Sequence, residues 1–198
     1  PTHSYHWSLD GTAQPVQVFA RAEQALNAQI INYRSSADGK WLLCGGIVMA
    51  NNAVNGLLQV YSVDLKASQP VMPSHAACFV TAQVDGRPNK SNLFCFTLLT
   101  PAPKFNVMEL GVPRDQALKR QADLPMQPGD FPMSMAPDDK WGMVYILTKM
   151  GQLIVYEVQS GTLLINMKAS DNFVSASSEC GESGGLVTVD ITGRVCKF

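Results

Sequence analysis

The sequence predicts an all-β fold, a β-propeller built of four-stranded blades. Short apolar runs bounded by turns rich in glycine, proline and aspartate recur along the chain, and no stretch sustains the periodicity of an amphipathic helix. The strand pattern that opens at Trp41 and ends at Val63 returns from Trp141 to Val158. A repeat of about 40 to 50 residues made of four short strands is typical of a propeller blade.

The first part of the chain contains one pair of strands and then one full set of four. The expected strands lie at 5–8, 16–20, 28–33, 41–50, 57–63 and, more weakly, 67–71. Residues 51–56 are polar and are expected to form a connection. Leu58 and Val60 alternate with Tyr61 and Val63, so both faces of this strand carry apolar side chains. That pattern predicts a sheet covered on both sides.

The second part repeats the cycle. The expected strands lie at 76–84, 93–99, 105–110, 132–135, 141–148, 151–158, 163–167, 173–176, 186–190 and 194–198. Three prolines and five charged residues in 111–129 predict a surface loop with room for one strand. Trp41 and Trp141 are expected to pack in the core or between blades.

The third strand of each cycle serves as a marker of the repeat. The marker residues are Tyr5, Leu58, Phe105, Leu153 and Val195, which are 53, 47, 48 and 42 residues apart. The chain therefore holds a two-strand remnant, three full blades and a last blade without its fourth strand. Because a blade buries its faces only against neighbours, this incomplete ring is expected to be marginally stable alone.

Composition limits the function classes. With 198 residues, 46% of them apolar, the chain is long enough for one domain, and its net charge of −1 argues against a broad nucleic-acid-binding surface. Three scattered histidines give no metal constellation. The five cysteines include no C-x-x-C pair and are interpreted as buried thiols: Cys44, Cys78, Cys95, Cys180 and Cys196.

One stretch resembles a catalytic motif. Residues 181–185, G-E-S-G-G, match G-x-S-x-G with Ser183 as the nucleophile. A nucleophile elbow requires a helix after the turn, whereas a strand is expected from Leu186, so a hairpin loop explains the motif better. A serine hydrolase using Ser183 remains one alternative, and an unrelated WD-repeat-like scaffold propeller remains another. Gly45 and Gly46, inside a strand pattern, are expected to mark a bulge or a close backbone approach rather than a phosphate loop.

Several segments carry a family resemblance. They are Y-H-W-S at 5–8, Q-I-I-N-Y-R at 29–34, K-W-L-L at 40–43, L-Q-V-Y-S-V-D-L-K-A-S-Q-P at 58–70 and I-L-T-K-M-G at 146–151. In this order they resemble the N-terminal domain of clathrin heavy chain, over essentially all of residues 1–198. The resemblance implies a seven-bladed propeller, of which this chain spans the end of the third blade through the seventh. It also implies a non-enzymatic protein with no catalytic residue, cofactor or metal.

The resemblance implies two peptide-binding sites. The family's site for a tryptophan-bearing peptide box aligns with Gln29, Ile31 and Ile47. A groove between the fourth and fifth blades, which takes an arrestin-type loop, aligns with the following residues: Trp41, Val60, Leu65, Gln69 and Val71. Leu65 departs from the family pattern, which has arginine there. The groove for the clathrin-box motif belongs to the first two blades and is expected to lie outside this chain.

The implied partners are short linear motifs of endocytic adaptors. Others are the remainder of the heavy chain and, through it, light chains and the triskelion. The implied location is the cytoplasm, at the cytoplasmic face of coated pits and coated vesicles. Membrane contact is expected only indirectly through adaptors, and nucleic acid is not an expected partner.

Overall fold

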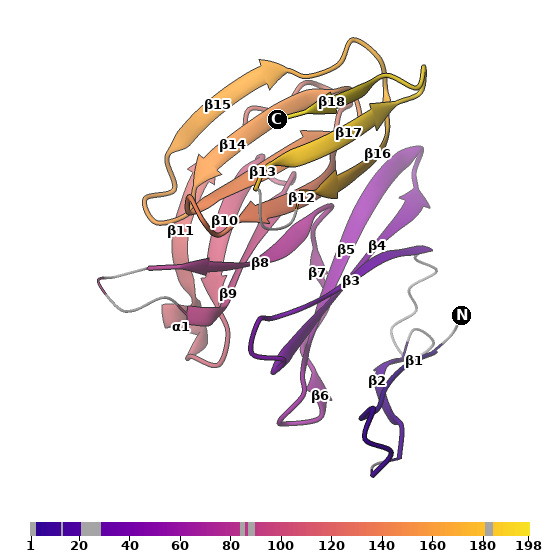
Figure 1. The fold of residues 1–198 in the computed structure, drawn as a ribbon, viewed down its shortest axis with the longest axis vertical. Helices are drawn as coiled ribbons and strands as arrows, with labels where there is room; N and C mark the ends of the chain where they lie inside the picture. Colours follow the sequence, from indigo (N-terminus) through magenta and orange to yellow (C-terminus); the bar gives the residue numbers. More distant parts are fainter. Residues whose placement is uncertain (1–2, 13, 21–28, 84–85, 87–89, 181–183) are drawn as a thin grey trace. The chain divides into compact units, whose positions relative to one another are not determined.

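The structure is a computed structural model that describes residues 3–12, 14–20, 29–83, 86, 90–180 and 184–198 (Figure 1). The chain divides into two compact units, Pro1–Pro73 and Ser74–Phe198, and each is described by itself. Strands make up nearly all of the regular structure, and within the described residues no helix is long and apolar enough to cross a membrane.

The first unit holds two antiparallel sheets. One pairs β1 (His3–His6) with β2 (Val16–Ala20). The other has the strand order β3-β4-β5-β6, with β7 pairing separately with β5. Its strands are β3 (Gln29–Ser35), β4 (Trp41–Ala50), β5 (Ala53–Ser62), β6 (Ala67–Ser68) and β7 (Met72–Pro73). This second sheet is the blade on which the candidate site lies.

The second unit holds three consecutive sheets. The first has the order β11-β10-β9-β8, the second β12-β13-β14-β15 and the third β16-β17-β18. The first comprises β8 (Ala77–Ala82), β9 (Lys90–Leu98), β10 (Lys104–Glu109) and β11 (Leu118–Asp123), with the short helix α1 (Arg114–Ala117) before β11. The others comprise β12 (Pro132–Asp138), β13 (Met143–Thr148), β14 (Gln152–Glu157), β15 (Leu163–Lys168), β16 (Val174–Glu179), β17 (Leu186–Asp190) and β18 (Val195–Lys197).

These sheets confirm the predicted all-β propeller of antiparallel blades. In the second unit, the innermost strand β12 lies beside β8 of the preceding blade and β16 of the following one (Figure 1). Four markers, Leu58, Phe105, Leu153 and Val195, each fall in the third strand of a sheet, as the repeat predicts. The assignment of these blades to the third through seventh of a ring stays a prediction.

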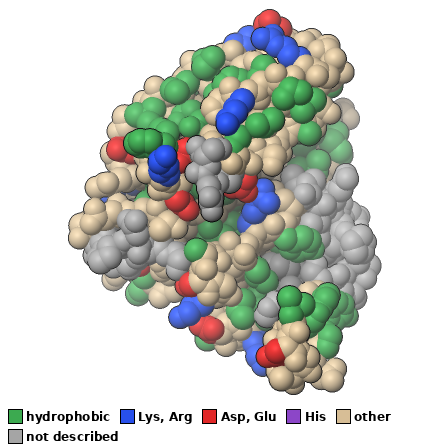
Figure 2. Space-filling view, in the orientation of Figure 1, with side chains coloured by type: hydrophobic (Ala, Val, Ile, Leu, Met, Phe, Trp, Pro, Cys, Tyr) green, Lys and Arg blue, Asp and Glu red, His purple; other side chains and the backbone are tan. Residues whose placement is uncertain are grey.

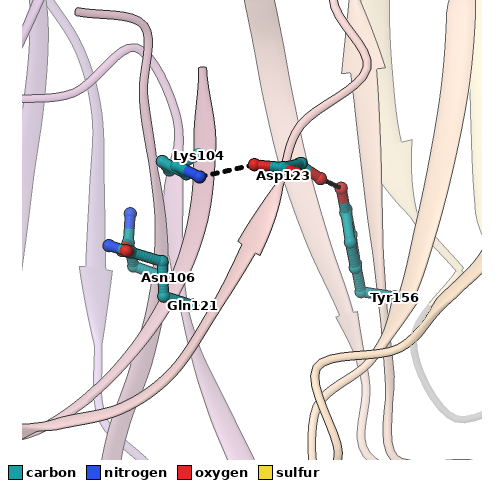
Figure 3. Close-up of polar contacts among 5 residues, drawn as sticks. All are labelled: Lys104, Asn106, Gln121, Asp123 and Tyr156. Atoms are coloured by element: carbon teal, nitrogen blue, oxygen red, sulfur yellow. Dashed lines mark hydrogen bonds and ion pairs between the residues drawn. The ribbon is translucent and has the colours of Figure 1, made fainter. Parts of the chain in front are cut away.

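Two blades of the second unit share one buried core. Phe105 and Tyr156, both with no exposed surface, stack with ring centroids 4.2 Å apart and an interplanar angle of 10°. The Tyr156 hydroxyl donates a hydrogen bond to the backbone carbonyl of Asp123, whose carboxylate pairs with Lys104 (Figure 3). The side chain of Tyr156 thus links β14 by a hydrogen bond to β11, the outer strand of the preceding blade.

A buried ion pair lies within the same blade as Asp123. Lys119 places its Nζ 3.1 Å from an Oε of Glu109, and their side chains are only 10% and 2% exposed. Asn106, on the same strand as Glu109, accepts a hydrogen bond from the amide of Gln121 at 2.8 Å (Figure 3). These contacts tie β11 to β10, so the predicted loop 111–129 contains an ordered strand.

Three sequence predictions need correction. Trp141 does not pack in the core: it lies in the turn after β12 and is 64% exposed, with the Lys140 ammonium 5.2 Å from its ring. The first strand begins and ends two residues earlier than expected. Residues 51–56 are mostly strand, because Asn51 and Asn52 alone make the turn, with φ of 52° and 59°. Positive φ at both central residues matches the twist of a tight hairpin.

The predicted buried thiols are confirmed for three cysteines. Cys44, Cys78 and Cys95 are buried, whereas Cys180 and Cys196 are partly exposed, and all five are free thiols. Burial raises the pKa of the Cys95 thiol, so that this group stays protonated and unreactive. Cys196 was predicted wrongly because it lies in β18, an edge strand of the three-stranded sheet, and Cys180 because it follows the end of β16.

Candidate peptide-binding face

One face of the blade β3–β6 holds most of the candidate residues. Strand alternation places Trp41, Leu43, Gly45, Ile47 and Met49 of β4 on the same face. Leu43 in the middle is 1% exposed, Trp41 and Ile47 are partly exposed, and Met49 is 67% exposed. The face is therefore buried at its centre and accessible toward both ends of β4.

The first candidate set meets at one end of this face. Gln29 of β3 and Gly56 of β5 are the direct cross-strand partners of Ile47. The structure thus brings two of the three predicted residues, Gln29 and Ile47, into one row. Ile31 lies at a shift of the β3 register, and the side chains of Gln29 and Ile31 are outside the described part of the structure.

A long hairpin extends beyond this row. β4 and β5 have ten residues each, whereas β8, β13 and β14 have six. The extra length carries the apolar Val48 and Met49 past Ile47 toward the turn at Asn51. Ile47 therefore lies at the base of a hairpin whose tip offers apolar side chains to solvent.

The second candidate set surrounds the other end of β4. Trp41 is the cross-strand partner of Ser62, and the backbone N–H of Gln69 donates a hydrogen bond to the Val60 carbonyl at 2.7 Å. Val60 is fully buried, so its side chain supports this region from within, and Gln69 and Val71 are partly exposed. Leu65 is 76% exposed in a turn.

The opposite face of the blade packs as the sequence predicts. Cys44 and Tyr61 are buried there against Leu42 and Val63. Burial raises the pKa of the Tyr61 hydroxyl above its ordinary value. Both faces of β5 are covered, so any ligand must use the partly exposed ends of β4 rather than the middle of the blade.

Sequence reasoning missed Asn32. Its side chain lies over Gly45, where a Cβ would come within 2.5 Å of the Asn32 Oδ1. The predicted close approach of backbone at Gly45 is wrong, since the near neighbour is the Asn32 side chain, and the β-bulge lies in the facing strand β3. The glycine in a strand pattern was the available signal, but the sequence does not show which side chain fills the space.

The structure gives no support to catalysis at the G-E-S-G-G motif. Ser183 lies outside the described residues; Gly184 and Gly185 adopt φ of +72° and +89°, and strand β17 follows at Leu186. The motif thus lies between β16 and β17, as predicted for a hairpin loop. Over the described ranges, no group of three or more His, Cys, Asp or Glu side chains could hold a metal ion.

Charges are spread rather than concentrated. On the face drawn in Figure 2, acidic and basic side chains are interspersed, in keeping with the net charge of −1. Among candidate residues, none is charged: the set consists of Gln29, Ile31, Trp41, Ile47, Val60, Gln69 and Val71. Recognition by these residues would rest on apolar contacts and hydrogen bonds.

Comparison with known proteins identifies relatives over nearly the whole chain. No family model matches. "Probable clathrin heavy chain 1" of Caenorhabditis elegans is 40% identical over 201 residues, and "Clathrin heavy chain 2" of Homo sapiens is 34% identical over the same length. Each alignment covers 98% of this chain and 12% of the relative, so the chain spans about an eighth of the length of these proteins.

A likeness to a solved structure concerns the fold alone. The crystal structure of Sqt1 from Chaetomium thermophilum superposes with a TM-score of 0.60 at 12% identity. The match covers 88% of this chain and 44% of Sqt1. It shows a likeness of fold and carries no information on ligands.

Proposed function

The chain is homologous to the N-terminal region of clathrin heavy chains over 98% of its own length, and from this premise we propose that it is a non-enzymatic, peptide-binding part of a clathrin propeller. Its ligands are short linear motifs in the disordered parts of endocytic adaptors. Binding them recruits the adaptors to the coat during vesicle formation, in the cytoplasm at the face of coated pits and vesicles.

The observation that supports the proposal is the pairing of Gln29 with Ile47. In the resembling family, the positions of these two residues belong to the site for a tryptophan-bearing peptide. Here they are cross-strand neighbours beside an accessible apolar hairpin. A polar residue next to apolar ones suits an extended peptide, whose alternate side chains need apolar contact while its main chain needs hydrogen bonds.

We propose a second contact region around Trp41, Gln69 and Val71. The partly exposed indole of Trp41 would provide the apolar contact for an arrestin-type loop. The exposed Leu65 stands where the family pattern has arginine, so recognition there would lack an electrostatic part. Each contact alone is weak, and many copies in one coat would strengthen binding through avidity.

The assembly partners follow from the same premise. The remainder of a heavy chain would link this segment to light chains and to the triskelion. Contact with the membrane would be indirect, through adaptors. These partners belong to the whole protein and are proposed for it rather than for the 198 residues alone.

A titration tests the first site. A fluorescent peptide carrying the tryptophan box is titrated against the full-length protein and against the Gln29→Ala/Ile31→Ser variant. We expect the variant to bind at least roughly ten-fold more weakly, because it loses one hydrogen-bonding group and one apolar contact. Trp41→Ala, at the other end of β4, is the matched control and should bind this peptide normally. Equal affinities for the wild type and the double variant would refute the site.

A further inference from the structure

The strand β3 contains a register shift that selects which residue faces Gly45. Gln29 pairs with Ile47 and Ile30 with Gly46, so in a regular ladder Ile31 would stand opposite Gly45. The shift between Ile30 and Asn32 places Asn32 there instead. A β-bulge of this kind re-aims side chains, and here it places the carboxamide of Asn32 opposite Gly45.

The carboxamide of Asn32 lies over Gly45, on the face of β4 that also holds Ile47. Gly45 and Ile47 are two residues apart on β4 and share a face, so Asn32, opposite Gly45, is on that face as well. Any side chain at position 45 would collide with it, since a Cβ there would lie 2.5 Å from Oδ1. The missing side chain of Gly45 thus leaves the space that the Asn32 amide occupies.

The Asn32 side chain is partly buried. Its amide neither donates nor accepts a hydrogen bond among the residues that the structure describes. Because the Asn32 side chain is only partly buried, its amide is open to a ligand that supplies a hydrogen-bonding partner. A carboxamide presents both a donor and an acceptor, the same pair that a peptide main chain presents.

We propose that Asn32 is a polar anchor that hydrogen bonds to the main chain of the bound peptide, next to the apolar contact that Ile47 provides. The proposal rests on the function proposed above, since it assumes a peptide at the Gln29–Ile47 row. Asn32 would fix the position of the extended peptide along β4, and Ile47 would select an apolar side chain at the adjacent position. Asn32 is therefore a positioning residue of this site.

The first test compares two carboxamides on opposite faces of the blade. Asn32→Ala should weaken binding of the tryptophan-box peptide by roughly five-fold in the full-length protein, the usual effect of one or two neutral hydrogen bonds. Asn55→Ala removes the amide of a residue that pairs with Val48, on the other face, and should leave affinity unchanged. Asn32→Ala should not lower the melting temperature, because the folded chain loses no hydrogen bond.

The second test identifies the partner of the amide. Peptides in which single backbone amides are replaced by esters lose one donor each. We expect one of them to bind the wild type several-fold more weakly yet to bind Asn32→Ala as the unmodified peptide does. Such coupling requires a direct contact, and a purely structural role of Asn32 would weaken all the peptides equally.

The outcomes separate this inference from the proposed function. If Gln29→Ala/Ile31→Ser abolishes binding while Asn32→Ala binds normally, the site stands and the anchor is wrong. If neither substitution changes affinity, the peptide binds elsewhere and both are wrong. A loss of thermal stability in Asn32→Ala, without coupling to any ester peptide, would assign Asn32 to folding and overturn the anchor.

Discussion

Tyr156→Phe measures what one inter-blade hydrogen bond contributes to stability. The substitution keeps the stacking on Phe105 and removes only the hydroxyl that donates to the Asp123 carbonyl (Figure 3). We expect the free energy of unfolding at pH 7 to fall by about 1 kcal/mol, the net value of such a hydrogen bond. Urea denaturation followed by circular dichroism gives this difference.

Tyr156 also makes the stability of the protein depend on pH in the alkaline range. Burial, and secondarily the charge of Asp123, raises the pKa of Tyr156 from 10.0 to about 12. The folded state thus retains the proton above pH 10 while the unfolded state loses it, so wild-type stability is complete below pH 10 and declines as pH rises toward 12. At pH 11 the wild type has lost about 1.4 kcal/mol of unfolding free energy in this way. The Tyr156→Phe variant has no such loss because phenylalanine does not ionise.

The two effects together predict a crossing. The wild type should be more stable than Tyr156→Phe at pH 7 by about 1 kcal/mol, and the difference should vanish near pH 11. Other ionisable groups titrate equally in both proteins and cancel in the comparison. A difference that stays constant from pH 7 to pH 11 would show that the tyrosine is not shielded in the folded state. No difference at either pH would refute the inter-blade hydrogen bond.

Three further predictions concern stability. Lys119→Met should cost several kcal/mol in denaturant titrations because it leaves Glu109 buried without its cation, and Glu109→Gln/Lys119→Met should recover part of the loss. Gly151→Ala should lower the melting temperature far more than Gly193→Ala, because only the Cβ at position 151 would collide with a backbone carbonyl. The two glycines have similar φ, so equal effects would contradict the predicted collision. Hydrogen bonds, chiefly from Thr192, lower the pKa of Asp190. The ionised carboxylate therefore stabilises the folded state, and this stabilisation is lost as pH falls below 3.8. In Asp190→Asn, the free energy of unfolding should depend less on pH in this acid range.

The strand pattern was largely predictable because its signals are local. Alternating apolar residues in β4 and β5, and glycine or aspartate in the turns, identify strands without knowledge of their neighbours. The spacing of Leu58, Phe105 and Leu153 then gives the blade repeat. The hairpin turn was missed because Asn51 and Asn52 were counted as polar connection rather than as residues that tolerate positive φ.

Burial of individual tryptophans was less predictable. Trp41 and Trp141 begin matching sequence patterns, yet Trp41 lies at the start of β4 and is partly buried, whereas Trp141 lies in a turn and is 64% exposed. β13 begins two residues later, at Met143, so Trp141 precedes the ladder in which its counterpart takes part. A repeat in sequence fixes which residues correspond but not where each strand starts to pair.

The sequence by itself determined the fold class and the blade repeat and carried the family resemblance, because periodicity and residue order are properties of a single chain. Gln29, Ile31 and Ile47 are site residues that the resemblance predicts. Only the tertiary structure decided that Gln29 pairs with Ile47, that a β-bulge turns Asn32 onto Gly45, and that Glu109 is buried with Lys119. These depend on the register between strands. A shift of one residue exchanges the faces of a strand while leaving the sequence pattern unchanged.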